Sequence, residues 1–283
     1  MLTIEKIIHA QRVLEEAIFK TDVVRTSNFI DGYELYLKAE NLQKTGSFKI
    51  RGAYYKISRL SDEEKKRGVI ACSAGNHAQG VALAAQKNGI PALICLPEGA
   101  PISKVEATRS YGAELCLVPG VYDDAYNRAI ELKEERGLTF IHPFDDEDVI
   151  AGQGTIGLEI LQQVKDVDAV VVPVGGGGLI SGVAFAVKSM NPKVQVYGVQ
   201  ASGAASMVTS LHDHKIECLP SVSTIADGIA VKQPGPLTFE YCSRYVDDIV
   251  TVTDEEICAA ILALIEKRKM IAEGAGATPV AAI

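Results

Sequence analysis

Apolar and polar side chains alternate along this chain with two different periods. Residues 4–19 carry isoleucine, leucine and alanine at helical spacing, which predicts an amphipathic helix. Residues 34–40 alternate apolar with polar side chains, which predicts a strand, and helical spacing returns from residue 49. From residue 68 onward, short apolar runs and amphipathic segments follow one another regularly. The succession of both periods predicts an α/β protein.

Between residues 68 and 141 the chain repeats a strand–helix unit. Such units build parallel sheets through right-handed crossovers, with helices covering both faces. The predicted strands are 69–72, 92–96, 114–118 and 139–141, and the predicted helices are 78–88, 103–111 and 123–135.

A second series runs from residue 155 onward. Its periodicity weakens over 201–233, which predicts loop with short helices. Asp254 is the expected N-cap of the last long helix. The predicted helices of this series are 155–164, 179–190 and 254–267, and its predicted strands are 169–174, 194–199 and 248–252.

The two series predict two open, mainly parallel twisted sheets with flanking helices. No flexible linker separates them, so we expect a cleft in which a small molecule binds at the carboxyl ends of strands. Glu273 and Gly274 open another apolar helical pattern, and the chain stops within it at Ile283. Because domains usually finish at exposed polar ends, we expect a C-terminal part of the protein to be missing.

Composition excludes several classes of protein. The net charge of −8 argues against sequence-independent nucleic-acid binding, which requires neutralisation of phosphates. No run of 18 apolar residues is present, so no membrane-spanning helix is expected. The first residues do not resemble a signal peptide. The six cysteines form no C-x-x-C pair, which favours free thiols in a reducing cytoplasm.

Residues 43–53 (Gln-Lys-Thr-Gly-Ser-Phe-Lys-Ile-Arg-Gly-Ala) connect a predicted strand to a predicted helix. Ser47 stands where an N-cap residue is expected. Lys49 then falls in the first helical turn, where the helix dipole disfavours an ammonium group. Such a lysine is explained if it works as a neutral amine; an ordinary surface lysine is the alternative.

Two further strand-to-helix turns carry candidate chemistry. Gly175-Gly176-Gly177-Gly178 provides backbone amides and a helix N-terminus for an anion, although a tight turn is the simpler alternative. Its spacing fits neither the dinucleotide fingerprint nor a Walker loop, which favours a different phosphorylated ligand. Ser73-Ala74-Gly75-Asn76-His77 is suited to a carboxylate, or to ordinary capping with a structural histidine.

A lysine amine together with a phosphate site is what pyridoxal phosphate requires, since the amine binds the cofactor covalently. The residues therefore favour pyridoxal phosphate as the cofactor. A metal site at His212-Asp213-His214 is a weaker alternative, because adjacent histidines in a polar loop are usually solvated.

Residues 43–53, the Ser73–His77 turn and the Gly175–Gly178 loop together resemble the threonine dehydratase and serine racemase family of fold-type II (tryptophan synthase β-like) pyridoxal-phosphate enzymes. The resemblance covers nearly the whole chain. It implies a small domain, residues 52–151, inserted in a large domain formed by residues 1–51 and 152–283.

The resemblance also implies roles for individual residues. Lys49 would bind the cofactor and act as the acid and base at the substrate Cα. The other implied cofactor-binding residues are Phe48, Asn76, Gly175, Gly176, Gly177, Gly178, Leu179 and Glu273, and the implied substrate-binding residues are Ser73, Ala74, Gly75, Asn76 and His77.

Three departures from the family bear on the activity. Racemases have a serine at the position of Ala74 that protonates the opposite face of Cα, and alanine carries no proton. Gln200 and Ser206 stand at positions matching the racemases' cation ligands, so no metal is expected. A Ser/Thr-Gly-Gly-Asn segment that meets the pyridine nitrogen in the family would lie beyond Ile283.

The implied activity is β-elimination of L-threonine, with L-serine as a second substrate, to 2-oxobutanoate (or pyruvate) and ammonia. The alternatives are a serine racemase, a 3-hydroxyaspartate dehydratase, and a catalytically impaired ligand-binding fragment of the same fold. The family further implies a cytoplasmic homo-oligomer, dimer or tetramer, with an allosteric small-molecule effector as a further expectation.

Overall fold

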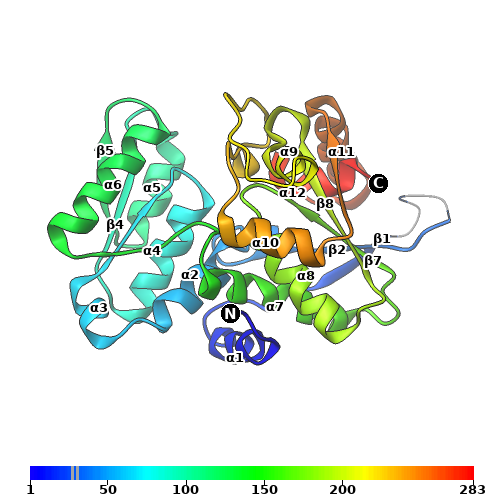
Figure 1. Ribbon diagram of the computed structural model, residues 1–283, viewed down its shortest axis with the longest axis horizontal. Helices are drawn as coiled ribbons and strands as arrows, with labels where there is room; N and C mark the ends of the chain where they lie inside the picture. The colour runs from blue at the N-terminus through cyan, green and yellow to red at the C-terminus, as the bar shows by residue number, and fades with distance from the viewer. Residues whose placement is uncertain (27–28, 30–31) are drawn as a thin grey trace.

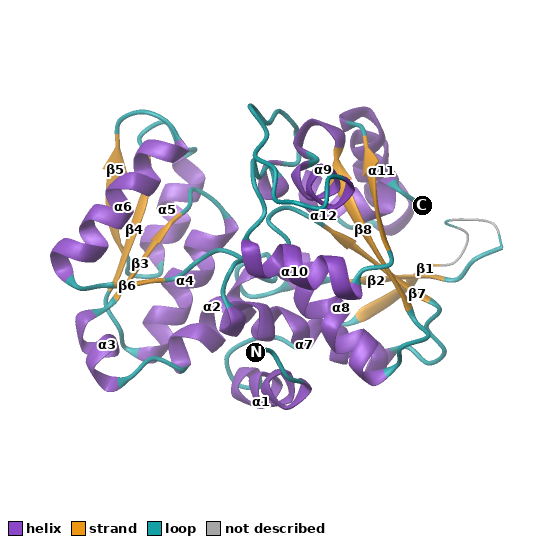
Figure 2. Ribbon diagram, in the orientation of Figure 1, coloured by secondary structure: helices purple, strands orange, loops and turns teal. Residues whose placement is uncertain are grey.

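The computed structural model describes residues 1–26, 29 and 32–283. In this part of the chain the strands form three sheets, and helices pack around them (Figure 1). Figure 2 shows the two larger sheets on opposite sides of the molecule, with several helices between them.

The first large sheet contains four parallel strands in the order β5-β4-β3-β6. Chain order runs outward from β3 to β5, and β6 then joins the other side of β3. Ligands of open α/β sheets bind where the strand order reverses in this way, here outside the carboxyl ends of β3 and β6. The strands are β3 (Val69–Cys72), β4 (Ala92–Pro97), β5 (Glu114–Val118) and β6 (Thr139–Phe140).

Helices cover both faces of this sheet. Buried alanine, valine and isoleucine side chains of the sheet pack against α2 and α4 on one face and against α6 on the other. The helices that flank the sheet or lie at its ends are α2 (Lys49–Ser58), α3 (Asp62–Arg67), α4 (Asn76–Asn88), α5 (Ile102–Ser110) and α6 (Tyr122–Arg136).

The second large sheet contains three parallel strands in the order β7-β8-β9. Its valine-rich strands pack on α8 on one face and on α11 and α12 on the other. Its elements are α7 (Glu147–Gln163), β7 (Ala169–Pro173), α8 (Gly178–Met190), β8 (Gln195–Ala201), α9 (Ser206–His212), α10 (Pro236–Tyr245), β9 (Asp248–Val252), α11 (Asp254–Arg268) and α12 (Gly274–Ala281).

The N-terminal segment connects to both large sheets. Helix α1 packs on α7 and α2, and the antiparallel pair β1–β2 precedes α2. These elements are α1 (Ile4–Leu14), β1 (Val23–Thr26) and β2 (Leu35–Lys38), and the short 3₁₀ helices of the chain are η1 (Glu40–Leu42), η2 (Ser202–Ala204) and η3 (Asp227–Ile229).

Several predicted element boundaries are wrong. The first helix ends at Leu14 rather than at residue 19, because a turn at Glu15 replaces the helical hydrogen bonds. Helix α7 begins at Glu147 rather than at residue 155, capped by the Asp146 carboxylate, and ends at Gln163. The periodicity also gave no sign of α10.

Two predicted N-caps are also wrong. Ser47 precedes the cap by one residue: Phe48 is the N-cap of α2, and the buried Ser47 hydroxyl has no hydrogen-bond partner among the described residues. Thr253, not Asp254, caps α11 through a capping box with Glu256. The Asp254 carboxylate instead accepts from the Thr224 hydroxyl and the Ile225 amide. In both cases the position relative to the first helical turn decides which side chain reaches the free amides.

Within the described residues, no helix is both long and apolar enough to cross a membrane. The division into a small domain, 52–151, and a large domain remains a prediction, although the four-stranded sheet lies entirely within residues 69–140.

Candidate active site

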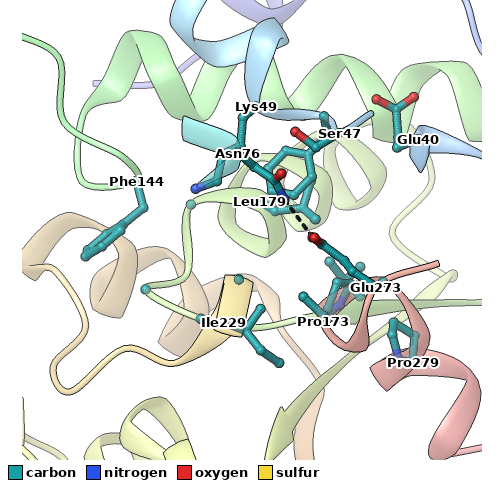
Figure 3. A pocket seen from close by; sticks show the side chains of 18 of the residues that line it. Glu40, Ser47, Lys49, Asn76, Phe144, Pro173, Leu179, Ile229, Glu273 and Pro279 are labelled. Atoms are coloured by element: carbon teal, nitrogen blue, oxygen red, sulfur yellow. Dashed lines mark hydrogen bonds between the residues drawn. The ribbon is translucent and has the colours of Figure 1, made fainter. Parts of the chain in front are cut away.

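One large cavity of about 2260 Å³ lies between the two larger sheets, next to the carboxyl ends of β3, β6 and β7. Small-molecule sites typically measure about 300–1,000 Å³, so this cavity has room for a cofactor together with a substrate. Figure 3 shows part of its lining. All the site residues predicted from the sequence line it: Phe48, Lys49, Ser73, Ala74, Gly75, Asn76, His77, Gly175, Gly176, Gly177, Gly178, Leu179 and Glu273.

Lys49 is the first residue of α2, and its amine lies in the cavity with a single acceptor, the Pro143 carbonyl oxygen at 2.9 Å. Burial lowers the pKa of Lys49 from 10.5 to about 8, against an opposing effect of the Glu273 carboxylate. The Phe48 ring lies 5.5 Å from the amine. A substantial fraction of this lysine is therefore neutral near pH 8, as a nucleophile or base requires.

The Ser73–His77 turn follows β3 and opens α4. Gly75 is the N-cap, and no side chain caps the helix, so the first amides of α4 remain free to bind an anion. The Ser73 hydroxyl accepts from the Gly75 amide at 3.1 Å. His77 is buried and hydrogen-bonds the Ile141 carbonyl oxygen at 2.8 Å. Burial lowers the pKa of His77 to about 3, which supports its structural interpretation.

The four-glycine loop connects β7 to α8, with Gly177 as N-cap at a φ of 94°. Side chains would not fit in this loop. A Cβ on Gly176 would collide with the Phe144 ring, and a Cβ on Gly178 would lie 2.8 Å from the Phe144 Cα. The Thr238 hydroxyl donates to the Gly176 carbonyl at 2.6 Å and fixes the loop. The loop thus presents bare backbone and a helix N-terminus, a suitable binding place for phosphate.

Asn76 and Glu273 meet across the cavity, where the Asn76 amide donates to the Glu273 carboxylate at 2.6 Å (Figure 3). Glu273 is the N-cap of α12. Burial raises the pKa of Glu273, while the hydrogen bond from Asn76 opposes that shift. In Figure 3 the Lys49 side chain extends toward the side on which Phe144 lies, away from this pair.

Sequence reasoning missed a segment that contacts most of the site, residues 141–145. Its carbonyl oxygens accept from His77 and from Lys49, and its Phe144 packs on the glycine loop. The Asp145 carboxylate caps α10 by accepting from the amides of Leu237 and Thr238. The available signal was the position of this segment, directly after the predicted strand 139–141.

A family model described as pyridoxal-phosphate dependent enzyme matches residues 14–283 of this chain. The chain belongs to the pyridoxal-phosphate dependent enzymes. This membership confirms the predicted cofactor and, together with the sheets described above, the predicted fold class.

Individual relatives of this pyridoxal-phosphate enzyme confirm the predicted resemblance. It is 57% identical over 285 residues to the L-threonine ammonia-lyase of Thermotoga maritima, covering 100% of this chain and 71% of that protein. It is 48% identical over 284 residues to the catabolic L-threonine dehydratase of Escherichia coli, covering 100% and 86%. The structure of maize serine racemase matches with a TM-score of 0.97 and 39% identity, covering 99% of this chain and 86% of that one.

The residues of the cavity fit pyridoxal phosphate. The cofactor needs an amine that can lose its proton, and the pKa of Lys49 is lowered to about 8. It needs a phosphate site free of side chains, and the tightly enclosed glycine loop has no space for a Cβ on Gly176 or Gly178. Ser47 lines the cavity, and its buried hydroxyl has no hydrogen-bond partner in the described chain.

Of the positions considered for metals, Gln200 and His212 have other partners, whereas the buried Ser206 hydroxyl has no hydrogen-bond partner among the described residues. The Gln200 amide donates to the Ala204 carbonyl oxygen at 3.2 Å and accepts from the Val208 amide at 2.9 Å. His212 hydrogen-bonds Asp213 at 2.7 Å, and its side chain is 86% exposed. The residues that the structure describes contain no group of three or more His, Cys, Asp or Glu side chains that could hold a metal ion.

Proposed function

We propose that this chain is an L-threonine ammonia-lyase, which converts L-threonine to 2-oxobutanoate and ammonia, with L-serine as a second substrate giving pyruvate. The observation that carries the proposal is Lys49, whose pKa is lowered to about 8 in the same cavity as the four-glycine loop. The names of two relatives, an L-threonine ammonia-lyase and an L-threonine dehydratase at 57% and 48% identity, support the choice of substrate.

The proposed roles of the residues follow the sequence predictions. Lys49 would hold the cofactor, with Phe48 against the ring and Asn76 at the ring hydroxyl. The amides of Gly175 to Gly178 and of Leu179 would bind the phosphate, and Glu273 would lie beside the ring. The substrate carboxylate would bind at the N-terminus of α4, where Ser73, Ala74, Gly75, Asn76 and His77 line the cavity. The Gly75 amide, which donates to the Ser73 hydroxyl, would exchange that acceptor for the carboxylate.

Bound pyridoxal phosphate supplies an electron sink for the bond that breaks at the substrate Cα. The chain supplies the base. The neutral Lys49 amine removes the Cα proton, and its burial keeps the proton affinity low enough for this role near neutral pH. The Pro143 carbonyl oxygen, 2.9 Å from the amine, orients it.

Serine racemase is the second candidate, because the structure of maize serine racemase is a close match, with a TM-score of 0.97. Ala74 argues against racemisation. Its methyl side chain packs against the core cluster of the four-stranded sheet and has no proton to deliver to the opposite face of Cα. Elimination needs a base on only one face of Cα, and Lys49 provides it. Lys49 together with Ala74 therefore supports elimination rather than racemisation.

A 3-hydroxyaspartate dehydratase would need a cation for the second carboxylate of its substrate. Two lysines that line the cavity, Lys104 and Lys232, are already paired with Asp227 and Asp123 at 2.5 and 3.2 Å. Their pairing favours a substrate whose β-substituent is uncharged.

The variant Lys49→Ala tests the proposal. Removing the amine removes both the cofactor attachment and the base, so we expect at least about a 1,000-fold loss of 2-oxobutanoate release and loss of the bound cofactor's absorbance. Lys44→Ala, which removes a lysine five positions upstream, should retain both. Retained turnover in Lys49→Ala would refute the proposed activity.

Two readouts with the unsubstituted chain separate the alternatives. Chiral analysis of serine recovered after incubation should show negligible D-serine; appreciable D-serine would favour the racemase. Appearance of cofactor absorbance without keto-acid release from any substrate would favour the ligand-binding fragment.

We further propose that residues 52–151 form a small domain inserted in the large one, and that the chain is a cytoplasmic homo-oligomer, dimer or tetramer, open to an allosteric effector. Six free thiols, three of them buried, support a reducing compartment.

The exposed Leu262 and Ile265 side chains on α11 support an apolar contact between subunits. Sedimentation velocity measures the assembly.

A further inference from the structure

His142 lines the cavity directly after β6, at the edge where the strand order of the first sheet reverses. Both of its neighbours are held in place. The Ile141 carbonyl oxygen is hydrogen-bonded to His77 at 2.8 Å, and the Pro143 carbonyl oxygen accepts from the Lys49 amine at 2.9 Å. The backbone that carries His142 is therefore fixed relative to the proposed base.

The tautomer of His142 is determined by its own backbone. Its Nδ1 accepts from the amides of Phe144 and Asp145 at 3.3 and 2.7 Å. A nitrogen that accepts two hydrogen bonds carries no proton, so the proton of the neutral ring lies on Nε2. The rings of Phe140 and Phe144 flank the imidazole edge-on, with centroids 6.1 and 4.7 Å away, and hold its plane.

The surroundings of His142 favour its neutral form. Burial lowers its pKa, and the Lys49 ammonium acts in the same direction, while Asp145 and Asp146 oppose the shift. A neutral imidazole with a fixed N–H is a known way for an enzyme to polarise a substrate oxygen without delivering charge. Within the described part of the chain Nε2 has no hydrogen-bond partner, and His142 lines the cavity, so this donor is free for a ligand.

We propose that His142 is a substrate-binding residue whose Nε2–H donates a hydrogen bond to the β-hydroxyl oxygen of the hydroxy-amino acid. This inference rests on the proposed function. The free amides at the N-terminus of α4 suit the substrate carboxylate, which leaves the β-hydroxyl as the oxygen for His142. The adjoining Phe144 ring offers an apolar surface for the methyl group of threonine.

The hydrogen bond strengthens as the Cβ–O bond breaks, because negative charge develops on the departing oxygen. The departing oxygen takes up the proton that Lys49 removed from Cα and leaves as water, so no proton transfer from His142 is needed. Nε2 keeps its proton, since Nδ1 is occupied by two backbone amides and cannot take up another proton in exchange.

The variant His142→Asn tests this role. The shorter amide can still accept from the two backbone amides near the position of Nδ1, but it removes the donor at Nε2. We expect kcat/KM on L-serine to fall about 10- to 100-fold, the size expected for one lost donor to a partly charged oxygen. On β-chloro-L-alanine, whose leaving group is chloride, the change should stay below about threefold.

Two further variants provide controls. His142→Gln, whose amide nitrogen reaches the position of Nε2, should recover part of the activity on L-serine. His212→Asn, an exposed histidine outside the cavity, should match the unsubstituted chain on both substrates. An equal loss on L-serine and β-chloro-L-alanine, or no loss on either, would overturn the proposal.

A measurement without turnover separates this inference from the proposed function. Nitrogen-15 NMR of the histidine rings in the cofactor-free chain should show His142 as the Nε2–H tautomer at pH 7. A proton on Nδ1 would overturn the inference even if the enzyme is active. Failure of the unsubstituted chain on both substrates, with the Nε2–H tautomer present, would instead refute the proposed function.

Discussion

Two cations of the first turn of α2, Lys49 and Arg51, stand two residues apart and have opposite environments. Arg51 is fully buried and makes five hydrogen bonds, to the carboxylates of Glu40 and Glu159 and to the Thr155 hydroxyl. The carboxylates outweigh the effect of burial and raise the pKa of Arg51. Lys49 has only a carbonyl oxygen as acceptor, and burial lowers its pKa to about 8.

The difference shows how the chain separates stability from reactivity. The Arg51 cluster joins α2 to η1 and α7, and Lys38 adds a further ion pair to Glu159 at 2.6 Å. Every charge in it has a partner, so burial is compensated. On the other side of the helix Lys49 keeps an incompletely satisfied amine. The Arg51 cluster, in which every charge is paired, therefore holds the helix that presents the reactive Lys49 amine.

The largest expected effect is on stability, from Arg51→Met. The substitution keeps side-chain volume but leaves the buried carboxylates of Glu40 and Glu159 with fewer partners. We expect the free energy of unfolding to fall by about 3–5 kcal/mol. Urea unfolding followed by circular dichroism measures the change.

Two controls sharpen the comparison between the cations. Lys49→Met should change the free energy of unfolding by less than about 1 kcal/mol, because no buried carboxylate depends on that amine as it does on Arg51. Adding Glu159→Gln to Arg51→Met should recover part of the lost stability by removing one unpaired charge. Equal destabilisation by Arg51→Met and Lys49→Met would contradict the distinction drawn between the two sites.

The second prediction concerns the titration of Lys49 in the cofactor-free chain. Its rate of acylation, followed by mass spectrometry, should reach half of its maximum near pH 8, because burial lowers the pKa. The exposed Lys215 is the control: its Glu217 partner raises its pKa, so its midpoint should lie above 10.5. A Lys49 midpoint at or above that of Lys215 would refute the description of the site.

The same pKa shift determines how stability depends on pH. Between pH 8 and 10.5 the unfolded chain binds more protons at Lys49 than the folded chain, so this group makes the free energy of unfolding rise with pH across that window. Glu273→Gln removes the carboxylate that opposes the shift, and the midpoint of Lys49 should then move below 8.

The smallest expected effect comes from two buried hydroxyl groups. Thr155 donates to the Gly152 carbonyl oxygen at 2.6 Å and accepts from Arg51, so Thr155→Val should lower the free energy of unfolding by about 1–2 kcal/mol. Ser47→Ala in the cofactor-free chain should leave the free energy of unfolding unchanged or raise it by up to about 1 kcal/mol, because the lost hydroxyl has no hydrogen-bond partner within the described residues. A clear loss of stability in Ser47→Ala would reveal a partner for that hydroxyl.

The parts of the site that could be predicted are those whose chemistry is local. Four successive glycines between a strand and a helix indicate an anion site wherever the strand lies. The strands β3, β5 and β9 have the predicted bounds. In β3 all four residues are buried, and such a short apolar run between polar segments marks a buried strand. The predicted N-cap at Ser47 failed because capping depends on a shift of a single residue, which periodicity does not resolve.

The role of residues 141–145 could not be predicted from local pattern. Its contacts reach His77 in α4, Lys49 in α2 and Thr238 in α10, all far away in sequence. The same holds for Arg51, which reads as an ordinary helical arginine until its partners Glu40 and Glu159 are brought together.

The sequence by itself determined the two strand–helix series, the glycine loop and the candidate lysine, because these depend on residue type and spacing. The tertiary structure decided that Arg51 is fully paired and that Lys49 remains reactive. That decision depends on burial and on partners from other elements, and the pKa of a lysine follows from its surroundings rather than from its neighbours in the chain. Only folding gives Arg51 its carboxylates and leaves Lys49 with a carbonyl oxygen.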